Sequence, residues 1–351
     1  MMESCVAAAK VAPAEGTLGL LSELRQAVKS QHPETCVSDA PCLASGGAFV
    51  RFLQSERGGP LVLRMKQFVH HVEGAPALVG EALALAVREF YLDADALLLA
   101  PGAGVELSAQ DALDGARDGL EQYVMGRLSR RAMPVDTAAQ AEERELHARC
   151  KALAPILTPA RLGMVARFSR GAPWPEAQAE LRAMERFATP RHKLACLLNC
   201  CARLNRSLAD SARAHAAEAA AQAAARAGAP AGDDASAPCA RESDARSCAH
   251  GADELLPALV TVMLHCTLRP LAASLAYAGA YRHPLRLEAD GEARYYLTLA
   301  LSSAQFIRTC GAAQLVGVSE RAFAAALAFG LSAVAADDEG APSGGRSNEI
   351  L

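Results

Sequence analysis

Two stretches in the last third of the sequence place polar side chains where they could act on a partner. Asp253 lies in the run 251–257 and Tyr295 lies in the run 291–298, and each run is expected to open an amphipathic helix. A carboxylate at a helix start faces the positive end of the helix dipole. It can cap the free backbone N–H groups, or it can present its charge to another molecule.

Tyr295 begins a polar stripe along its predicted helix. The stripe continues at steps of three, four and three residues with Thr298, Ser302 and Gln305. Residues at such steps share one face of a helix. From the residues alone the stripe is a solvated face, Asp253 is a candidate helix cap, and Tyr295 is a candidate packing residue.

Motifs of covalent and metal-dependent enzymes do not occur in the sequence. It contains no Gly-x-Ser-x-Gly elbow, no His-Glu-x-x-His motif, no phosphate-binding Gly loop followed by Lys-Ser or Lys-Thr, and no dinucleotide fingerprint. His70 and His71 are the only paired histidines, and neighbouring residues of a helix point about 100° apart, which makes a poor metal site. We therefore expect no metal ion, no cofactor and no bond-making chemistry.

Composition and charge limit the class of protein. The chain has 351 residues, a formal net charge of −4, 51% hydrophobic residues and 21% charged residues. This balance is typical of a soluble globular protein and lacks the basic surface that nucleic-acid binding requires. The longest apolar run is shorter than the ~20 residues that cross a bilayer, and the first residues resemble neither a signal nor a transit peptide. We expect a cytoplasmic protein.

The cysteines do not form a recognisable metal or disulfide framework. There are eleven of them, but no Cys-x-x-Cys pair. Cys196, Cys200 and Cys201 share one predicted helix without a further ligand at zinc-finger distance. We expect buried, reduced thiols that pack as small apolar groups.

Hydrophobic residues recur at three- and four-residue steps through much of the chain, whereas no convincing period-2 pattern occurs, and this predicts an all-α protein. Several short helices with short loops between Phe49 and Arg131 indicate an antiparallel helical bundle at 46–135. Ser108 is the expected N-cap of the last helix in that bundle.

Start signals predict further helices in the second half. Thr158–Pro159 and Thr189–Pro190 each combine a capping threonine with a proline at the first helical position. The helix that opens near Asp253 is apolar nearly all round and should be central. Its Pro257 is expected in the first turn. A final helix is expected over 319–335.

Three segments have a biased composition. Residues 1–45 are rich in Ala, Pro, Ser and Gly, which predicts a flexible tail in which only Leu18–Val28 shows helical periodicity. Residues 209–250 predict a low-complexity insertion, within which 212–227 could form a fluctuating alanine helix. The acidic and Gly-rich residues 337–351 are expected to be disordered.

Several short motifs occur in an order and spacing that resemble one family. They are Asp118–Met125, Pro190–Cys196, Leu198–Cys201, Gly251–Pro257, Gly291–Glu292 followed by Tyr295–Thr298, and Phe306–Ile307. With them the chain resembles the vacuolar-protein-sorting-nine (VPS-nine) domain family, and its short plant-type members most of all. Members of this family are guanine-nucleotide exchange factors for Rab-five-class GTPases. The resemblance covers roughly residues 50–316 and implies an all-helical exchange domain at 142–320 that contains the insertion.

The resemblance implies roles for two residues. Asp253 matches the family's catalytic aspartate, and Tyr295 matches its second essential residue. A GTPase holds GDP through Mg²⁺ and a phosphate-binding lysine. A carboxylate pushed into that site would compete for the lysine, repel the phosphate and be incompatible with the metal. Tyr295 would hydrogen-bond the switch-region backbone, so that both residues face the same partner.

The same resemblance implies a wider GTPase-binding surface. Leu256, Pro257 and Val260 would line a groove for switch aromatics, and Thr298 and Ser302 would extend the polar contact. The implied partners are GDP-bound and nucleotide-free Rab-five-class GTPases. Recruitment to endosomal membranes would be transient and peripheral, through the GTPase or other partners.

The sequence departs from the family pattern in three places. Leu299 stands where members usually carry Asn, Thr267-Leu268-Arg269 replaces Asn-Pro-Pro, and Ala272-Ala273-Ser274 replaces His-Ser-Asn. These departures leave a second function open, that of a VPS-nine-fold adaptor which binds a Rab GTPase without releasing its nucleotide.

Overall fold

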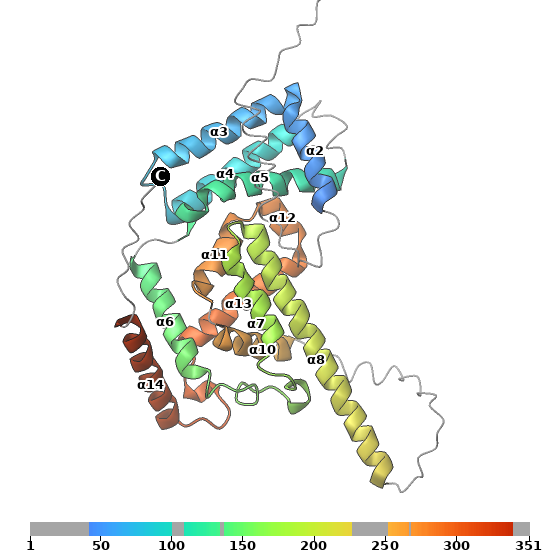
Figure 1. Ribbon diagram of the computed structural model, residues 1–351, viewed down its shortest axis with the longest axis vertical. Coiled ribbons are helices and arrows are strands. Elements are labelled where there is room, and N and C mark those ends of the chain that lie inside the picture. The colour runs from blue at the N-terminus through green and yellow to red at the C-terminus, as the bar shows by residue number, and fades with distance from the viewer. Residues whose placement is uncertain (1–41, 100–108, 134–136, 227–251, 267, 340–351) are drawn as a thin grey trace, which may run out of the picture. The chain divides into compact units, whose positions relative to one another are not determined.

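The computed structural model describes residues 42–99, 109–133, 137–226, 252–266 and 268–339. Within these ranges the regular structure is helical and no strand occurs (Figure 1). The prediction of an all-α protein is confirmed. The predicted Ser108 cap, most of the predicted tails, and the part of the predicted insertion after Arg226 lie outside the described residues.

The chain forms two compact units that are not contiguous in sequence. The first contains the described residues up to Met133 together with Phe187–Arg191 and Tyr277–Gly291, and the second contains the other described residues. The residues of three helices, α8 (Pro190–Arg226), α11 (Leu271–Tyr281) and α13 (Gly291–Thr309), are divided between the units, although only Gly291 of α13 belongs to the first. The domain limits that the sequence suggests, 46–135 and 142–320, stay predictions.

A helical bundle makes up most of the first unit. Its helices are α2 (Cys42–Gln54), α3 (Gly59–Gly74), α4 (Gly80–Leu98), α5 (Gln110–Ala132) and the short α12 (Pro284–Ala289), with a 3₁₀ turn at Glu56–Gly58. α5 packs against α2, α3 and α4. Gly119 permits the close approach of α2, because a Cβ atom there would lie 2.5 Å from Cδ1 of Phe49.

Buried charges on α5 hold distant segments of the first unit together. The carboxylate of Glu121 is fully buried and accepts hydrogen bonds from the Arg282 guanidinium (2.6 Å) and from the backbone N–H groups of Arg191 and His283 (both 2.9 Å). Asp118 pairs with Arg282 at 2.8 Å. Two of the family-like motifs, Asp118–Met125 and Pro190–Cys196, are therefore joined by this ionic network.

Arginines determine the protonation of the same network. Burial by itself would raise the pKa of Asp118, but Arg282, Arg191 and Arg286 more than offset it, so that the pKa lies below its usual value. Arg286 also pairs with Asp114 at 2.6 Å. Asp118 therefore stays charged inside the fold, where an unpaired charge would be costly.

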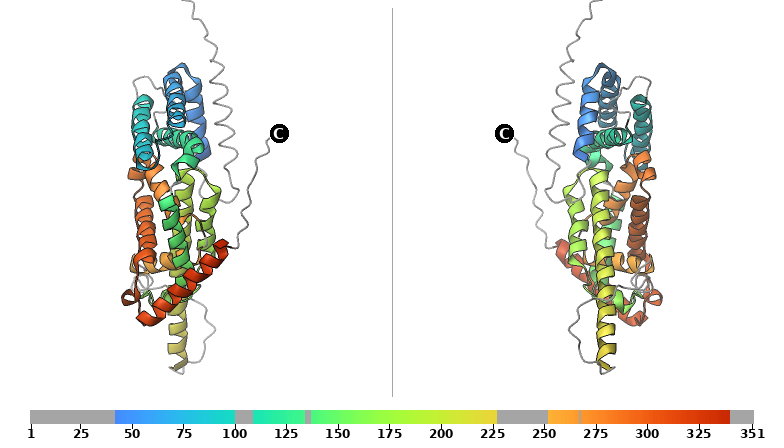
Figure 2. Two further views of the ribbon diagram at one scale, coloured as in Figure 1. Left: turned by 90° about the vertical axis from the view of Figure 1, so that its left-hand side faces the viewer. Right: turned by 90° about the vertical axis from the view of Figure 1, so that its right-hand side faces the viewer.

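The second unit contains most of the remaining helices. They are α6 (Thr137–Leu153), α7 (Pro175–Arg182), α10 (Ala252–His265), α13 (Gly291–Thr309), α14 (Glu320–Glu339) and most of α8, with 3₁₀ turns at Ala166–Phe168, Ala183–Arg186 and Ala312–Gln314. α6 packs against α10 and α14, and α10 also packs against α7. Figure 2 shows α8 extending past the other helices of this unit.

Most of the predicted helix boundaries are close to the observed ones, with two differences. α8 begins at Pro190 as predicted, and it continues without a break through the alanine-rich residues to Arg226. The helix predicted after Thr158–Pro159 is wrong, because the chain forms hydrogen-bonded turns there instead, with N–H of Met164 bonded to the carbonyl of Pro159 at 2.9 Å. Gly163, at a φ of 84°, turns the chain out of a helical path.

Candidate functional site

Asp253 lies inside the first turn of α10. The helix begins at Ala252, so Asp253 is its second residue and not the residue that precedes it. Its side chain is exposed and makes no hydrogen bond or ion pair with the described part of the chain. A carboxylate in this position is stabilised by the helix dipole and remains accessible to a partner.

The position of Pro257 differs from the prediction. Counted from Ala252 it is the sixth residue of α10, so it lies beyond the first turn. Because proline has no N–H group, the carbonyl of Asp253 lacks its donor four residues later. Because of this missing donor, the turn that carries Asp253 is held by fewer backbone hydrogen bonds than the rest of α10. One turn further on, the hydroxyl of Thr261 donates a hydrogen bond to the carbonyl of Pro257 at 2.9 Å.

The rest of α10 is an interior helix. Leu255, Leu259, Val262 and Met263 are buried, which confirms the predicted central position. Val260 is 1% exposed and Pro257 is buried as well, whereas Leu256 is half-buried. Of the three predicted apolar contact residues, only Leu256 presents surface to a partner in this structure.

α13 has the two faces that its sequence predicts. Tyr295 is 46% exposed, and Thr298, Ser302 and Gln305 are exposed with it. The opposite face is buried and consists of Tyr296, Ala300, Ser303, Ala304 and Ile307. The exposed face also carries Leu301, a large apolar side chain that the polar pattern did not indicate.

The hydroxyl groups of the exposed face differ in their availability. The Thr298 hydroxyl donates to the carbonyl of Arg294 at 2.9 Å, so its proton is already used within the helix. Thr298 therefore has lone pairs to offer, but no free donor.

Asn205 holds the start of α13 and was missed by sequence reasoning. Its side-chain amide donates to the hydroxyl of Tyr296 at 2.8 Å, and burial raises the pKa of that tyrosine. The ring of Tyr296 lies 5.3 Å from the ring of Tyr295, at an interplanar angle of 59°. The only sequence signal was a polar residue beside the apolar stripe of α8.

α10 and α13 share one support. The Arg149 guanidinium on α6 donates to the carbonyls of Ile307 and Cys310, each at 2.8 Å. α6 also packs against α10. Asp253 and Tyr295 thus belong to helices of one unit that rest on α6, while no hydrogen bond, ion pair or ring contact among the described residues joins the two directly.

The departures from the family pattern range from buried to exposed positions, with Arg269 exposed and Ala272 and Ala273 half-buried. Ser274 is buried and accepts a hydrogen bond from the ammonium group of Lys193 at 3.4 Å. Leu268 is buried, Leu299 is half-buried, and Thr267 lies outside the described residues. The N-terminus of α11 is covered by Glu143 of α6, which accepts from the N–H of Leu271 at 3.1 Å. This acceptor satisfies one of the free N–H groups of the helix start.

A reactive thiol, a metal site or a membrane-spanning helix in the described residues would point to a further function. Cys196, Cys200 and Cys201 are buried and outside any disulfide, and burial raises the pKa of Cys201 to about 12. No cluster of three or more His, Cys, Asp or Glu residues in the described ranges could hold a metal ion. No described helix combines the length and the apolar character that a membrane crossing requires.

The sequence of this region matches a known domain family. Residues 174–311 fit the family model of the vacuolar sorting protein 9 (VPS9) domain. This segment matches the VPS9 domain family. It includes α7, α8, α10, α11, α12 and α13, and therefore both Asp253 and Tyr295. The family that the sequence motifs resemble is confirmed.

Known proteins with similar sequences include plant members of the family. Vacuolar protein sorting-associated protein 9A of Arabidopsis thaliana is 28% identical over 260 residues, which are 74% of this chain and 43% of the relative. The protein of the same name from Oryza sativa subsp. japonica is 29% identical over 224 residues, 63% of this chain and 39% of the relative. This chain thus spans less than half the length of these curated relatives.

A relative from animals shares a shorter region. The receptor-mediated endocytosis protein 6 homolog of Drosophila pseudoobscura pseudoobscura is 26% identical over 200 residues, 56% of this chain and 9% of the relative. The similarity to plant proteins extends further along the chain than the similarity to this one.

Proposed function

We propose that the protein is a guanine-nucleotide exchange factor for a small GTPase of the Rab-five class, acting in endosomal or vacuolar traffic. The observation that carries this proposal is the exposed Asp253 carboxylate in the first turn of α10, within a VPS9 domain and without a partner among the described residues. The names of the relatives, which refer to vacuolar sorting and receptor-mediated endocytosis, support the cellular process.

Charge explains how such a residue can release a nucleotide. GDP is held on a GTPase by Mg²⁺ and by a lysine that neutralise the phosphates. The Asp253 carboxylate, inserted near the phosphate site, takes the lysine as its own ion-pair partner and repels the phosphate. The exchange factor thereby stabilises the nucleotide-free GTPase relative to the GDP-bound form. Preferential binding of a high-energy state is what accelerates the reaction.

The exposed face of α13 supplies the orientation. Tyr295 presents a phenol hydroxyl and a ring, and Ser302 and Gln305 continue the polar surface. Tyr295 hydrogen-bonds the switch backbone of the GTPase, and Thr298 accepts hydrogen bonds at the edge of the contact. Leu256 contributes apolar contact, whereas Pro257 and Val260 act from the interior by shaping α10.

Release of fluorescent GDP from a panel of purified Rab GTPases tests the proposal. We expect acceleration with one or more members of the Rab-five class and none with Rab proteins of other classes. A panel without any accelerated member would overturn the proposal.

The adaptor function is the second candidate. The substitutions at Leu268 and at Ser274, which lies in α11, favour it, because both residues are buried and both differ from the family pattern. Stable binding to nucleotide-free GTPase without faster GDP release would establish this function.

A further inference from the structure

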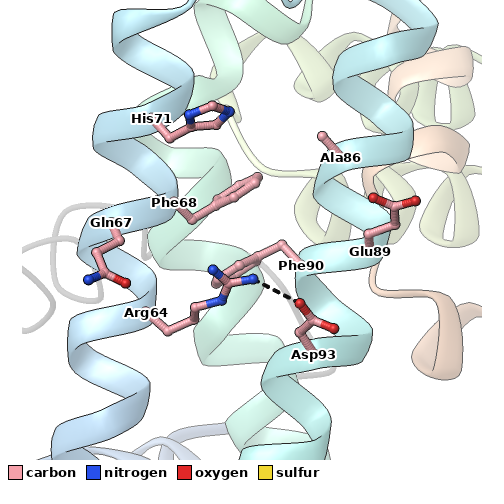
Figure 3. Close-up of a pocket in the computed structure, with 8 residues that line it drawn as sticks. All are labelled: Arg64, Gln67, Phe68, His71, Ala86, Glu89, Phe90 and Asp93. Carbon is pink, nitrogen blue, oxygen red and sulfur yellow. Dashed lines mark hydrogen bonds and ion pairs between the residues drawn. The ribbon is translucent and has the colours of Figure 1, made fainter.

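The bundle of the first unit carries a groove that the proposed function does not use. It lies between α3 and α4 and has a volume of about 470 Å³ (Figure 3). Its floor is the pair Phe68 and Phe90, whose rings stack with centroids 4.2 Å apart and an interplanar angle of 14°. Phe68 is half-buried, so part of this aromatic floor can be reached from solvent.

The rim of the groove carries one charge without a partner. The Arg64 guanidinium on α3 pairs with Asp93 on α4 at 2.9 Å (Figure 3). Glu89 also lines the groove and is exposed, and its carboxylate makes no hydrogen bond or ion pair with the described residues. Since Arg64 and Asp93 neutralise each other, Glu89 leaves the rim of α4 negative.

Three exposed leucines each directly precede, in the sequence, a residue that lines this groove. Leu63 on α3 is 57% exposed, and on α4 Leu85 and Leu92 are 57% and 45% exposed. The two leucines of α4 stand four residues before and three residues after Glu89, so all three share one helix face. A single exposed leucine needs no explanation. Three exposed leucines together with an aromatic floor are typical of a groove that receives an amphipathic helix.

We propose that residues 18–29 of the same chain occupy this groove as an amphipathic helix. In a helical conformation Leu21, Leu24 and Val28 share one face, and Arg25 and Lys29 lie together along one edge of it. The apolar face complements the phenylalanine floor and the three exposed leucines. The basic edge complements the unpaired Glu89. A helix of this length is marginal in water, so docking provides its stability.

The connection is long enough for this docking. Twelve residues, 30–41, separate Lys29 from the start of α2 at Cys42, and they can span ~40 Å when extended. α2 packs against α3, and the 16 residues of α3 measure ~24 Å in length. Every part of the groove is therefore within reach. The docked helix itself, at ~18 Å, is shorter than either wall.

Hydrogen–deuterium exchange on the full chain tests the proposal. We expect the backbone amides of residues 18–28 to exchange at least about tenfold more slowly in the protein than in a synthetic peptide of the same residues. The double substitution Leu21→Asp and Leu24→Asp should return them to the rate of the peptide. Exchange in the wild-type protein at the peptide rate would overturn the proposal.

Charge reversal identifies the groove as the binding site. Glu89→Arg should speed exchange in residues 18–28 about two- to fivefold, as expected for loss of an exposed ion pair, and adding Arg25→Glu should restore the protection. Glu73→Arg makes the same charge change at an exposed position of α3 outside the groove and should have no effect. Equal effects of both reversals would contradict this site. Protection that rises with protein concentration would also contradict it, because the occupant would then be a second copy.

Discussion

At the scale of single residues, exposure separates two roles that Asp253 could have. A helix cap is engaged by the backbone it caps. Asp253 instead lies within the first turn, exposed and without a partner in the described structure. Its side chain therefore contributes little to stability, and its charge is accessible to a partner.

Removal of this charge should stop nucleotide exchange without unfolding the protein. For Asp253→Asn we expect kcat/KM for GDP release to fall about 10²–10³-fold, the size of effect that follows loss of one well-placed electrostatic group. Helix content by circular dichroism should be unchanged. Glu320→Gln, an exposed first-turn acid of α14 outside the VPS9 domain, is the matched control and should keep full activity. Retained activity in Asp253→Asn would show that the charge is not required.

The two neighbouring tyrosines should behave differently. Tyr295→Ala removes an exposed contact, so exchange should fall about tenfold or more while stability stays within ~0.5 kcal/mol of wild type. Tyr296→Phe deletes the acceptor of the Asn205 amide, so stability should fall by about 1 kcal/mol. GDP release and urea unfolding, measured on both variants, distinguish these roles. An equal loss of stability in both would contradict the assignment.

At the scale of helices, α5 depends on charges that other segments bring to it. Glu121 and Asp118 are buried, and Arg282 is the residue that pairs with both. The geometry combines short ion pairs with backbone N–H donors, which is the arrangement that compensates for burial. Stability of the bundle is therefore coupled to residues more than 150 positions away in the sequence.

Removing the shared arginine of this network should lower the stability of the protein. Arg282→Met leaves two buried carboxylates without their shared partner, and we expect the free energy of unfolding to fall by about 3–5 kcal/mol. Arg170→Met removes an exposed ion pair with Glu218 and should cost at most ~1 kcal/mol. Chemical denaturation of both variants gives the comparison. A similar small cost for both would mean that the buried network does not stabilise the fold.

Helix signals in the sequence were reliable where a local rule decides the structure. Pro190 opens α8 and the two faces of α13 are as expected, because a proline at a helix start and a regular periodicity act locally. The turns after Thr158 and the position of Pro257 depend on how the chain packs, which a local rule does not describe. Asn205 escaped notice for the same reason, since its partner Tyr296 is 91 residues away.

At the scale of the whole molecule, buried ionisable groups make stability depend on pH. His283 is fully buried, and its ring stacks on Tyr91 with centroids 5.0 Å apart. Both ring nitrogens lack a hydrogen-bond partner among the described residues. Burial, opposed by Asp95 and Asp118 and assisted by Arg117 and Arg282, lowers the pKa of His283 to about 4. The folded protein therefore holds a neutral imidazole.

The protein should lose stability as the pH falls below 6.5. In that range the unfolded chain binds a proton at His283, whereas the folded chain binds one only near pH 4. Stability is thus fully present above pH 6.5, and a loss on the order of 3 kcal/mol accumulates as pH falls through this window. His283→Phe should flatten the profile, apart from a smaller contribution of His265, whose pKa burial also lowers. Urea unfolding at pH 7 and pH 4.5 measures the free energy of unfolding of both proteins. If this free energy falls between the two pH values by the same amount in the variant as in the wild type, the role of His283 is contradicted.

One consequence of the buried network concerns how this domain could be inherited. The VPS9 match covers residues 174–311, yet Arg191, Arg282 and Arg286 inside it find their acidic partners on α5, far outside it. A chain that consists of the matched segment alone would thus leave these three arginines without their acidic partners. The matched segment can therefore move between proteins with these ion pairs intact only if α5 moves with it.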